Sequence, residues 1–358
     1  ELEYDEKWHI FTVKDKKVPP KTLGFSKKKE LAFPGSVGST ELYSNTLYVV
    51  DELTGIYLIH AVDLKVPDKP TIPFFGAQDI LVANDAAYIA GGEAGVFVYA
   101  IGIPTATLAL KTSLDTEGSA EALAVYTRMG KETAESEDQE TGESKKIEKE
   151  VLISSTLYVA DGANGVVILD AKQPVSPIRT VTISRQGFVN NVLYHDDHLY
   201  ISQGEQGWSI VNVRNPKQYR DVLLRDTKGD VQDIAVNERF IAVADGKNGL
   251  LVYHNAEDLT KISAEPAAVI RTTGFVSDVE LVKNYAILAD GVEGVKVVDL
   301  ANLEHPVVRA SAATPGEYSF RQVWANRLQP EDSSEREKFE RSLDDLRNEA
   351  MMLAAGMV

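Results

Sequence analysis

Side chains with oxygen ligands occur at one repeated position, which lies 16 residues before a recurring glycine in five units and is assigned by alignment for Glu121 and Gln322. The position is occupied by Ser39, Asp79, Glu121, Asn191, Asp233, Asp278 and Gln322. If equivalent units form a ring, these side chains converge at one mouth of a central channel. The predicted binding ring comprises Asp79, Glu121, Asn191, Asp233, Asp278 and Gln322. Its four carboxylates, on Asp79, Glu121, Asp233 and Asp278, could coordinate a hard cation such as Ca²⁺. The alternative is structural, because an Asp that precedes a strand commonly accepts hydrogen bonds from backbone N–H groups.

A second set of carboxylates lies in the turns that contain the recurring glycine. The set comprises Asp51, Glu52, Glu93, Asp161, Glu205, Asp245, Asp290 and Glu293. An Asp followed by Gly is adequately explained as a turn residue. Because all these turns are expected on one face, we also predict that this face is acidic and attracts a basic partner.

Signals for catalysis are weak. The six histidines are scattered, and only His195 and His198 are close together, in the segment HDDH, which favours an exposed hairpin tip over a metal site. No nucleophile elbow, zinc-protease, phosphate-loop or dinucleotide-binding motif is present. The absence of cysteine excludes disulfides, thiolate metal sites and cysteine nucleophiles. The sequence therefore favours a non-enzymatic function without a cofactor. The alternative is a calcium-dependent hydrolase or lyase with its site at the channel mouth.

The elements that must position these residues recur with a period of about 42 residues, which indicates a repeat architecture. Each unit has a short apolar strand, a five-residue turn that ends in glycine, and a second alternating strand. The turn glycines are Gly55, Gly95, Gly165, Gly207, Gly249 and Gly294. Further strands before and after this pair give four per unit, which is typical of a β-propeller blade. A tyrosine recurs at one place on the second strand, at Tyr48, Tyr88, Tyr158 and Tyr200, and is interpreted as packing between blades.

The two ends of the chain are predicted to supply a seventh blade. Strands in the segments LEYDEKWHIFTVKD and PKTLGF would combine with a first strand from FRQVWANRL, which would close the ring and remove exposed edges. We therefore expect an all-β protein with a seven-bladed propeller of four-stranded blades over residues 1–328, followed by a helical extension over residues 329–358.

The stretches GVVILDAKQPVSPIRTVTISRQGFVNNVLYHDDHLYISQGEQG and GVKVVDLANLEHPVVRA resemble the LVIVD-repeat family. The resemblance extends over roughly residues 1–328, although Asn212 and His254 stand where Asp170 and Asp299 carry the acidic residue of the family. It implies a β-propeller that is commonly exported or located at the cell surface. An extracytoplasmic location is therefore expected from the resemblance alone.

Two segments fall outside the repeat. Residues 128–150 are strongly charged and are expected to form a solvated loop inserted in the third blade, with a partner-docking arm as the alternative. Residues 331–358 are predicted to form an amphipathic helix, which lies either against the propeller or on a partner. Its apolar positions include Phe339, Leu343, Leu346 and Leu353.

Composition limits the partners. The chain has 358 residues and a net charge of −17, which argues against nucleic acid, and no apolar run is long enough for a transmembrane helix. We expect an interaction scaffold or accessory subunit that binds a protein partner, or a second copy, through the acidic face and the C-terminal helix.

Overall fold

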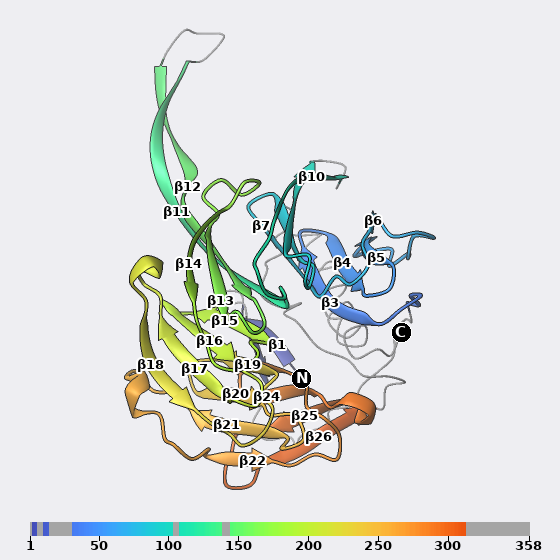
Figure 1. The fold of residues 1–358 in the computed structure, drawn as a ribbon, viewed down its shortest axis with the longest axis vertical. Helices are drawn as coiled ribbons and strands as arrows, with labels where there is room; N and C mark the ends of the chain where they lie inside the picture. Colours follow the sequence, from blue (N-terminus) through green and yellow to red (C-terminus); the bar gives the residue numbers. More distant parts are fainter. Residues whose placement is uncertain (1, 6–9, 14–30, 103–106, 138–143, 313–358) are drawn as a thin grey trace.

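The computed structural model describes residues 2–5, 10–13, 31–102, 107–137 and 144–312. Within these ranges the chain forms six four-stranded antiparallel sheets, which are arranged around a centre as the blades of a propeller (Figure 1). The same ranges contain no α-helix, only the single-turn 3₁₀ helices η1 (Pro216–Gln218), η2 (Leu259–Lys261) and η3 (Gly291–Glu293). None of these helices is long or apolar enough to cross a membrane.

Each blade is built from four strands that follow one another in the sequence. Blade 1 contains β3 (Val37–Tyr43), β4 (Thr46–Asp51), β5 (Gly55–His60) and β6 (Ile72–Pro73). Blade 2 contains β7 (Asp79–Ala83), β8 (Ala86–Ala90), β9 (Val96–Gly102) and β10 (Thr107–Leu114). Blade 3 contains β11 (Ala122–Glu137), β12 (Ser144–Ala160), β13 (Val166–Asp170) and β14 (Ile178–Ile183).

The second half of the propeller follows the same order. Blade 4 contains β15 (Asn191–His195), β16 (His198–Ser202), β17 (Trp208–Asn212) and β18 (Arg220–Arg225). Blade 5 contains β19 (Asp233–Val236), β20 (Phe240–Ala244), β21 (Leu250–His254) and β22 (Ala268–Ile270). Blade 6 contains β23 (Asp278–Val282), β24 (Tyr285–Ala289), β25 (Val295–Asp299) and β26 (Val307–Ala312). The first strand of each blade is innermost, and inner strands of successive blades contact one another from β3 to β23.

The predicted seven-bladed ring is wrong, because the described residues form six blades. The segments β1 (Leu2–Asp5) and β2 (Ile10–Val13), which were assigned to a seventh blade, pair with each other as a separate two-stranded sheet. Pairing between strands that are adjacent in sequence requires no strand from the other end of the chain. The strands expected in residues 20–25 and 320–328 lie outside the described residues, and so does the predicted C-terminal helix.

The core lies between the blades. Within the body of the propeller, the second strand of each blade is largely buried on both faces, since it packs against the neighbouring blade on either side; in β8 and β20 every residue is buried. The four tyrosines at the shared place on this strand, Tyr48, Tyr88, Tyr158 and Tyr200, are all almost fully buried. The ring of Tyr194 stacks on Tyr158 across the boundary between blades 4 and 3, at 5.8 Å between ring centroids. The packing interpretation of this repeated tyrosine is thus confirmed.

The turn glycine has the conformation that the sequence predicts. Its φ is positive in all six blades, for example +96° at Gly165 and +80° at Gly207. A Cβ atom at Gly207 would also lie 2.0 Å from the carbonyl oxygen of Arg225 on the outer strand. Both the backbone conformation and the close approach therefore require glycine.

Residues 128–150 do not form the expected loop. Their described parts belong to β11 and β12, which pair residue by residue from Ala122 and Ala160 out to Glu137 and Ser144. We call residues 129–137 with 144–152 the arm. The arm projects well beyond the body of the propeller (Figure 1). Regular pairing continues through the charged sequence because cross-strand residues of opposite charge support it.

Candidate functional site

Antiparallel order places the loops of every blade on two opposite faces. The turns between second and third strands share one face with the connections from each outer strand to the next blade, and we call this the turn face. Short bridges hold the two kinds of loop together, as between Gly162 and Val189 and between Gly204 and Val231. The turns between first and second strands, including the arm, start from the opposite face.

Two members of the predicted binding ring connect three blades each. Asp79 accepts a hydrogen bond from the Ser39 hydroxyl of blade 1 at 2.6 Å and another from the backbone N–H of Leu123 in blade 3 at 2.8 Å. Asp233 accepts from the side-chain amide of Asn191 in blade 4 and from the N–H of Val279 in blade 6, the latter at 3.1 Å. Both carboxylates are buried. Asp79 and Asp233 therefore have the structural role that was given as the alternative, because their carboxylate oxygens accept hydrogen bonds from neighbouring blades.

Glu121 does not belong to the ring. The register pairs Asp79 with Ala90, Asp233 with Ala244 and Asp278 with Ala289, and in blade 3 it is Ala122 that pairs with the corresponding Ala160. Glu121 instead occupies the preceding position. The residues at that position donate a backbone N–H to the second strand, and they are Gln78, Glu121, Asn190, Gln232 and Ser277.

A small apolar residue two places before the ring position could have given the correct alignment. This residue is Ala77, Ala120, Val189, Val231 or Val276, according to the blade. Of the remaining predicted residues, Asp278 is buried at the start of β23, and Asn191 is half-buried. Gln322 lies outside the described residues, as do Phe339, Leu343, Leu346 and Leu353.

The turn carboxylates divide into two groups with different roles. Asp51, Asp161, Asp245 and Asp290 have no exposed surface, whereas Glu52, Glu93, Glu205 and Glu293 are exposed. The four buried aspartates therefore cannot belong to an acidic surface. They stabilise the loops of the turn face instead.

Three of the buried aspartates, Asp51, Asp245 and Asp290, accept hydrogen bonds from the connection that enters their own blade. The Thr227 hydroxyl donates to Asp245 at 2.6 Å, and the Thr272 hydroxyl donates to Asp290 at 2.6 Å. In blade 1, Asp51 accepts from the backbone N–H of Gly35 at 2.7 Å. These bonds fix the turn to the connection and so define the shape of the turn face.

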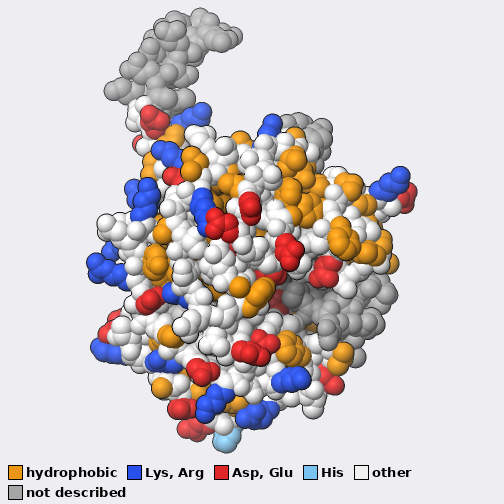
Figure 2. All heavy atoms as spheres, viewed as in Figure 1, with side chains coloured by type: hydrophobic (Ala, Val, Ile, Leu, Met, Phe, Trp, Pro, Cys, Tyr) orange, Lys and Arg blue, Asp and Glu red, His pale blue; other side chains and the backbone are white. Residues whose placement is uncertain are grey.

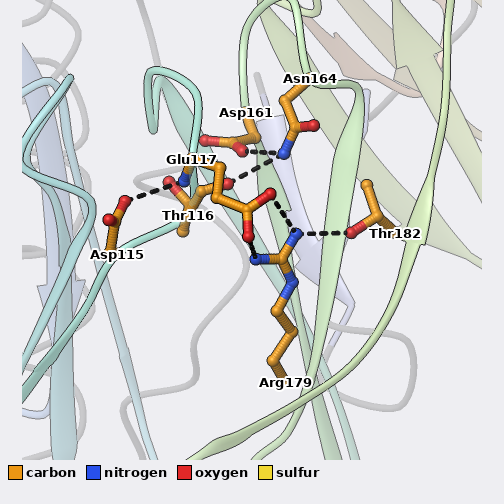
Figure 3. A network of polar contacts seen from close by, with 7 residues as sticks. All are labelled: Asp115, Thr116, Glu117, Asp161, Asn164, Arg179 and Thr182. Atoms are coloured by element: carbon orange, nitrogen blue, oxygen red, sulfur yellow. Dashed lines mark hydrogen bonds and ion pairs between the residues drawn. The ribbon is translucent and has the colours of Figure 1, made fainter.

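In blade 3 the turn and the connection are joined through Asn164 instead, and an ion pair lies beside them (Figure 3). The Asn164 amide donates to Asp161 at 2.7 Å and to the carbonyl oxygen of Thr116 at 2.9 Å. Next to it, the Arg179 guanidinium donates to the Glu117 carboxylate at 2.8 Å, although both side chains are partly exposed to solvent. Burial raises the pKa of Asp161, while its hydrogen bonds and the nearby Arg179 lower it, so the raising effect prevails.

Sequence reasoning missed the Thr-x-Gly segments that accompany these aspartates. They are Thr116-Glu117-Gly118, Thr227-Lys228-Gly229 and Thr272-Thr273-Gly274. The glycine is required because a Cβ atom at Gly118 would lie 2.3 Å from the carbonyl oxygen of Asp161, and one at Gly274 would lie 2.0 Å from that of Asp290. Their recurrence just before the inner strand was the available signal.

The exposed charges of the turn face are predominantly acidic. The exposed carboxylates on its loops are Glu52, Glu93, Asp115, Glu117, Glu205, Asp226 and Glu293. The exposed basic residues on the same loops are Lys228, Lys247 and Arg271. Burial, and then repulsion from Glu205, raise the pKa of Asp230, which shows that carboxylates from blades 4 and 5 lie close together there. Figure 2, which shows one face of the molecule, has acidic side chains near its middle and most Lys and Arg towards its rim.

Exposed apolar side chains lie on the same loops. Leu53 and Val292 stand at one position of the turns and are 53% and 67% exposed. Phe75 and Phe188 lie in connections and are 80% and 43% exposed, and the ring of Phe188 covers Gly162. Burial of these side chains by a partner would remove apolar surface from water.

The HDDH segment forms the hairpin tip that the sequence favours. Asp196 and Asp197 both have positive φ, as a two-residue hairpin turn requires. The ring nitrogens of His198 contact the Asp196 carbonyl oxygen and the Asn212 amide. Across the described ranges, no three His, Asp or Glu side chains lie close enough together to hold a metal ion.

Comparison with known proteins agrees with this architecture. The LVIVD repeat family model matches residues 156–182, 228–252 and 273–314. The comparison with curated proteins found no match. Among solved structures, Sqt1 of Saccharomyces cerevisiae is similar with a TM-score of 0.54 and 9% identity, over 87% of this chain and 92% of that one. The computationally designed Ika8 protein is similar with a TM-score of 0.50 and 11% identity, over 84% of this chain and 92% of that one. At these identities the two structures support the fold alone. The matched segments fall on blades 3, 5 and 6 and their boundaries, so the chain is a β-propeller that contains LVIVD repeats.

Proposed function

We propose that the protein is a non-enzymatic interaction scaffold whose turn face binds a protein segment with basic and apolar side chains. The observation that carries the proposal is the surface of the described turn-face loops, where exposed carboxylates outnumber exposed basic residues and exposed leucine, valine and phenylalanine side chains lie on the same loops.

The chemistry of this face favours such a partner for two reasons. Carboxylates from several blades add to one field that steers a basic segment and increases its association rate. The exposed apolar groups would then supply the contact area that is removed from water on binding, which contributes about 25 cal/mol per Å² of apolar surface. The buried aspartates support this role indirectly, because they hold the loops in one arrangement and reduce the ordering cost of binding.

The test uses a basic amphipathic peptide, rich in Lys and Leu, as the probe. Its affinity is measured by fluorescence anisotropy for the wild-type protein and for a variant with Glu52, Glu93, Glu205 and Glu293 changed to Gln. We expect the variant to bind at least about tenfold more weakly at low salt, with a smaller dependence on salt concentration.

The matched control changes four exposed carboxylates on the opposite face to Asn or Gln. These residues are Asp68, Glu238, Glu257 and Glu304. The control removes the same net charge, so its affinity for the peptide should stay within about twofold of the wild type because distant exposed charges are screened. Equal weakening by both variants would show that net charge, and not the turn face, governs binding, and the proposal would then be abandoned.

A further inference from the structure

The outer edges of the propeller blades are protected against pairing with other strands. Four outer strands carry a β-bulge, at the register shifts between Leu110 and Thr112 in β10 and at corresponding places in β14, β18 and β26. The remaining outer strands, β6 and β22, are only 2 and 3 residues long. Bulges and short edge strands are the usual devices that prevent edge-to-edge association.

The arm lacks this protection. Its bulge lies at its base, where the register shifts between Arg128 and Met129, and pairing is regular from Met129 and Leu152 to Glu137 and Ser144. Strand β13 pairs with β12 only over Thr156–Ala160. Among the described residues, no strand pairs with the outer side of β11 or β12 within the arm. The arm therefore presents two regular, open strand edges.

A two-stranded ribbon is marginally stable in water on its own, and a third strand normally stabilises it. The base of the arm also exposes apolar groups on both of its faces. Met129 is 50% exposed, and Ile153, whose side chain lies against Gly130, is 39% exposed. Both properties are consistent with an element that is completed by another strand.

The charges of the arm indicate which strand fits. The register places Lys131 opposite Glu150, Glu132 opposite Lys149 and Glu135 opposite Lys146. A diagonal ion pair joins Lys131 and Glu148 at 2.9 Å. The charge sequence of β12 is therefore complementary to that of β11, and a second copy of the chain can supply another β11.

We propose that the arm is a self-association element, in which β11 of one copy pairs antiparallel with the open edge of β12 in another copy, in the register used within the arm. The geometry allows this register, because N–H and C=O groups of alternate residues in a strand point to opposite edges. The contact is heterologous, so assembly extends beyond two chains or closes into a ring. The arm starts from the face opposite the turn face, so this proposal does not depend on the proposed function.

The first test removes the arm. Residues 131–150 are replaced by Asn-Gly, which forms a two-residue hairpin turn between Gly130 and Val151. By sedimentation equilibrium over a concentration series, we expect the wild-type protein to reach average masses above that of one chain, and the variant to remain monomeric. The melting temperature of the variant reports on the propeller and should be unchanged. A wild-type protein that is monomeric at every concentration overturns the proposal.

The second test examines the complementary charges. A variant with Lys131→Glu, Glu132→Lys, Glu148→Lys, Lys149→Glu and Glu150→Lys keeps opposite charges within its own arm, the diagonal pair of residues 131 and 148 included, and between copies of itself. It should therefore self-associate like the wild type. In mixtures of the two proteins carrying different fluorophores, like charges meet at each mixed contact, so energy transfer between them should fall severalfold below that of each protein with itself. Equal transfer in mixed and unmixed samples contradicts the proposed register and pairing.

Discussion

Asp79 and Asp233 show how one side chain can hold adjacent blades together. Each carboxylate is buried and accepts hydrogen bonds from the blade before it and the blade after it. A hydrogen bond to a charged group contributes more than one between neutral groups, and removing the acceptor leaves a buried N–H without a partner. Blade 3 has Ala122 at the equivalent position, and an alanine side chain cannot accept a hydrogen bond from a neighbouring blade.

Asp233→Ala should therefore destabilise the protein by about 2–4 kcal/mol, because the N–H of Val279 loses its acceptor. Urea denaturation followed by circular dichroism measures this free energy of unfolding. The exposed turn-face substitution Glu205→Ala is the control and should change it by less than about 0.5 kcal/mol. A loss for Asp233→Ala as small as that of the control would show that the inter-blade bonds contribute little.

We expect Glu280 to make the stability of the protein depend on pH near neutrality. It lies in β23, and the equivalent position carries Glu41 in blade 1 and apolar residues in the other blades, namely Leu81, Ala124, Leu193 and Ala235. Burial, and then the neighbouring Asp233, raise its pKa to about 8. Between its ordinary value of 4.5 and about 8, the folded state binds more protons than the unfolded state, so stability falls as the pH rises.

Glu280→Gln should remove this contribution. Between pH 5 and pH 8, the wild type should lose up to about 1.4 kcal/mol of stability per pH unit relative to the variant. Denaturation curves of both proteins at several pH values measure the difference. The pH-dependent contributions of other buried carboxylates, such as Asp161 and Asp245, do not affect this difference because both proteins contain them. Identical pH profiles for the two proteins would show that Glu280 titrates at its ordinary pKa.

At the scale of the elements, most of the strands could be predicted from the sequence. Alternating or continuous apolar runs between glycine-containing turns identify second and third strands, because those patterns reflect local burial. The arm could not be predicted in this way. Its composition resembles that of a solvated loop, and its strands are recognisable only when the charges of β11 and β12 are aligned across the hairpin.

The connections that precede the inner strands depend on close packing against the turns. Gly274→Ala would place a Cβ atom 2.0 Å from the carbonyl oxygen of Asp290, so it should destabilise the protein by about 2–4 kcal/mol. Gly76→Ala is the matched control, because Gly76 has a positive φ but no atom within 4 Å of the added Cβ. Strain alone should then cost about 1 kcal/mol. Thermal and urea denaturation of both variants measures the two losses of stability. A smaller loss for Gly274→Ala than for Gly76→Ala would contradict the prediction.

At the scale of the whole molecule, the six blades divide its loops between two faces with different chemistry. The turn face combines carboxylates and apolar groups from all parts of the chain, whereas the arm starts from the opposite face. A partner bound to the turn face and a second copy bound to the arm could therefore be present together. The expected extracytoplasmic location stays a prediction from the family resemblance.

The sequence by itself determined the repeat, the four-stranded blade, the turn glycine and the burial of the second strand, because each of these follows from patterns within one unit. Only the tertiary structure decided that the described residues form six blades, that Glu121 lies outside the ring, and that Asp51, Asp161, Asp245 and Asp290 are buried. These features depend on contacts between blades or between a connection and a turn, such as the bonds that Asp79 accepts from residues 40 and 44 positions away. Such partners leave no local periodicity, so the register and the burial of each carboxylate become fixed only when the blades pack together.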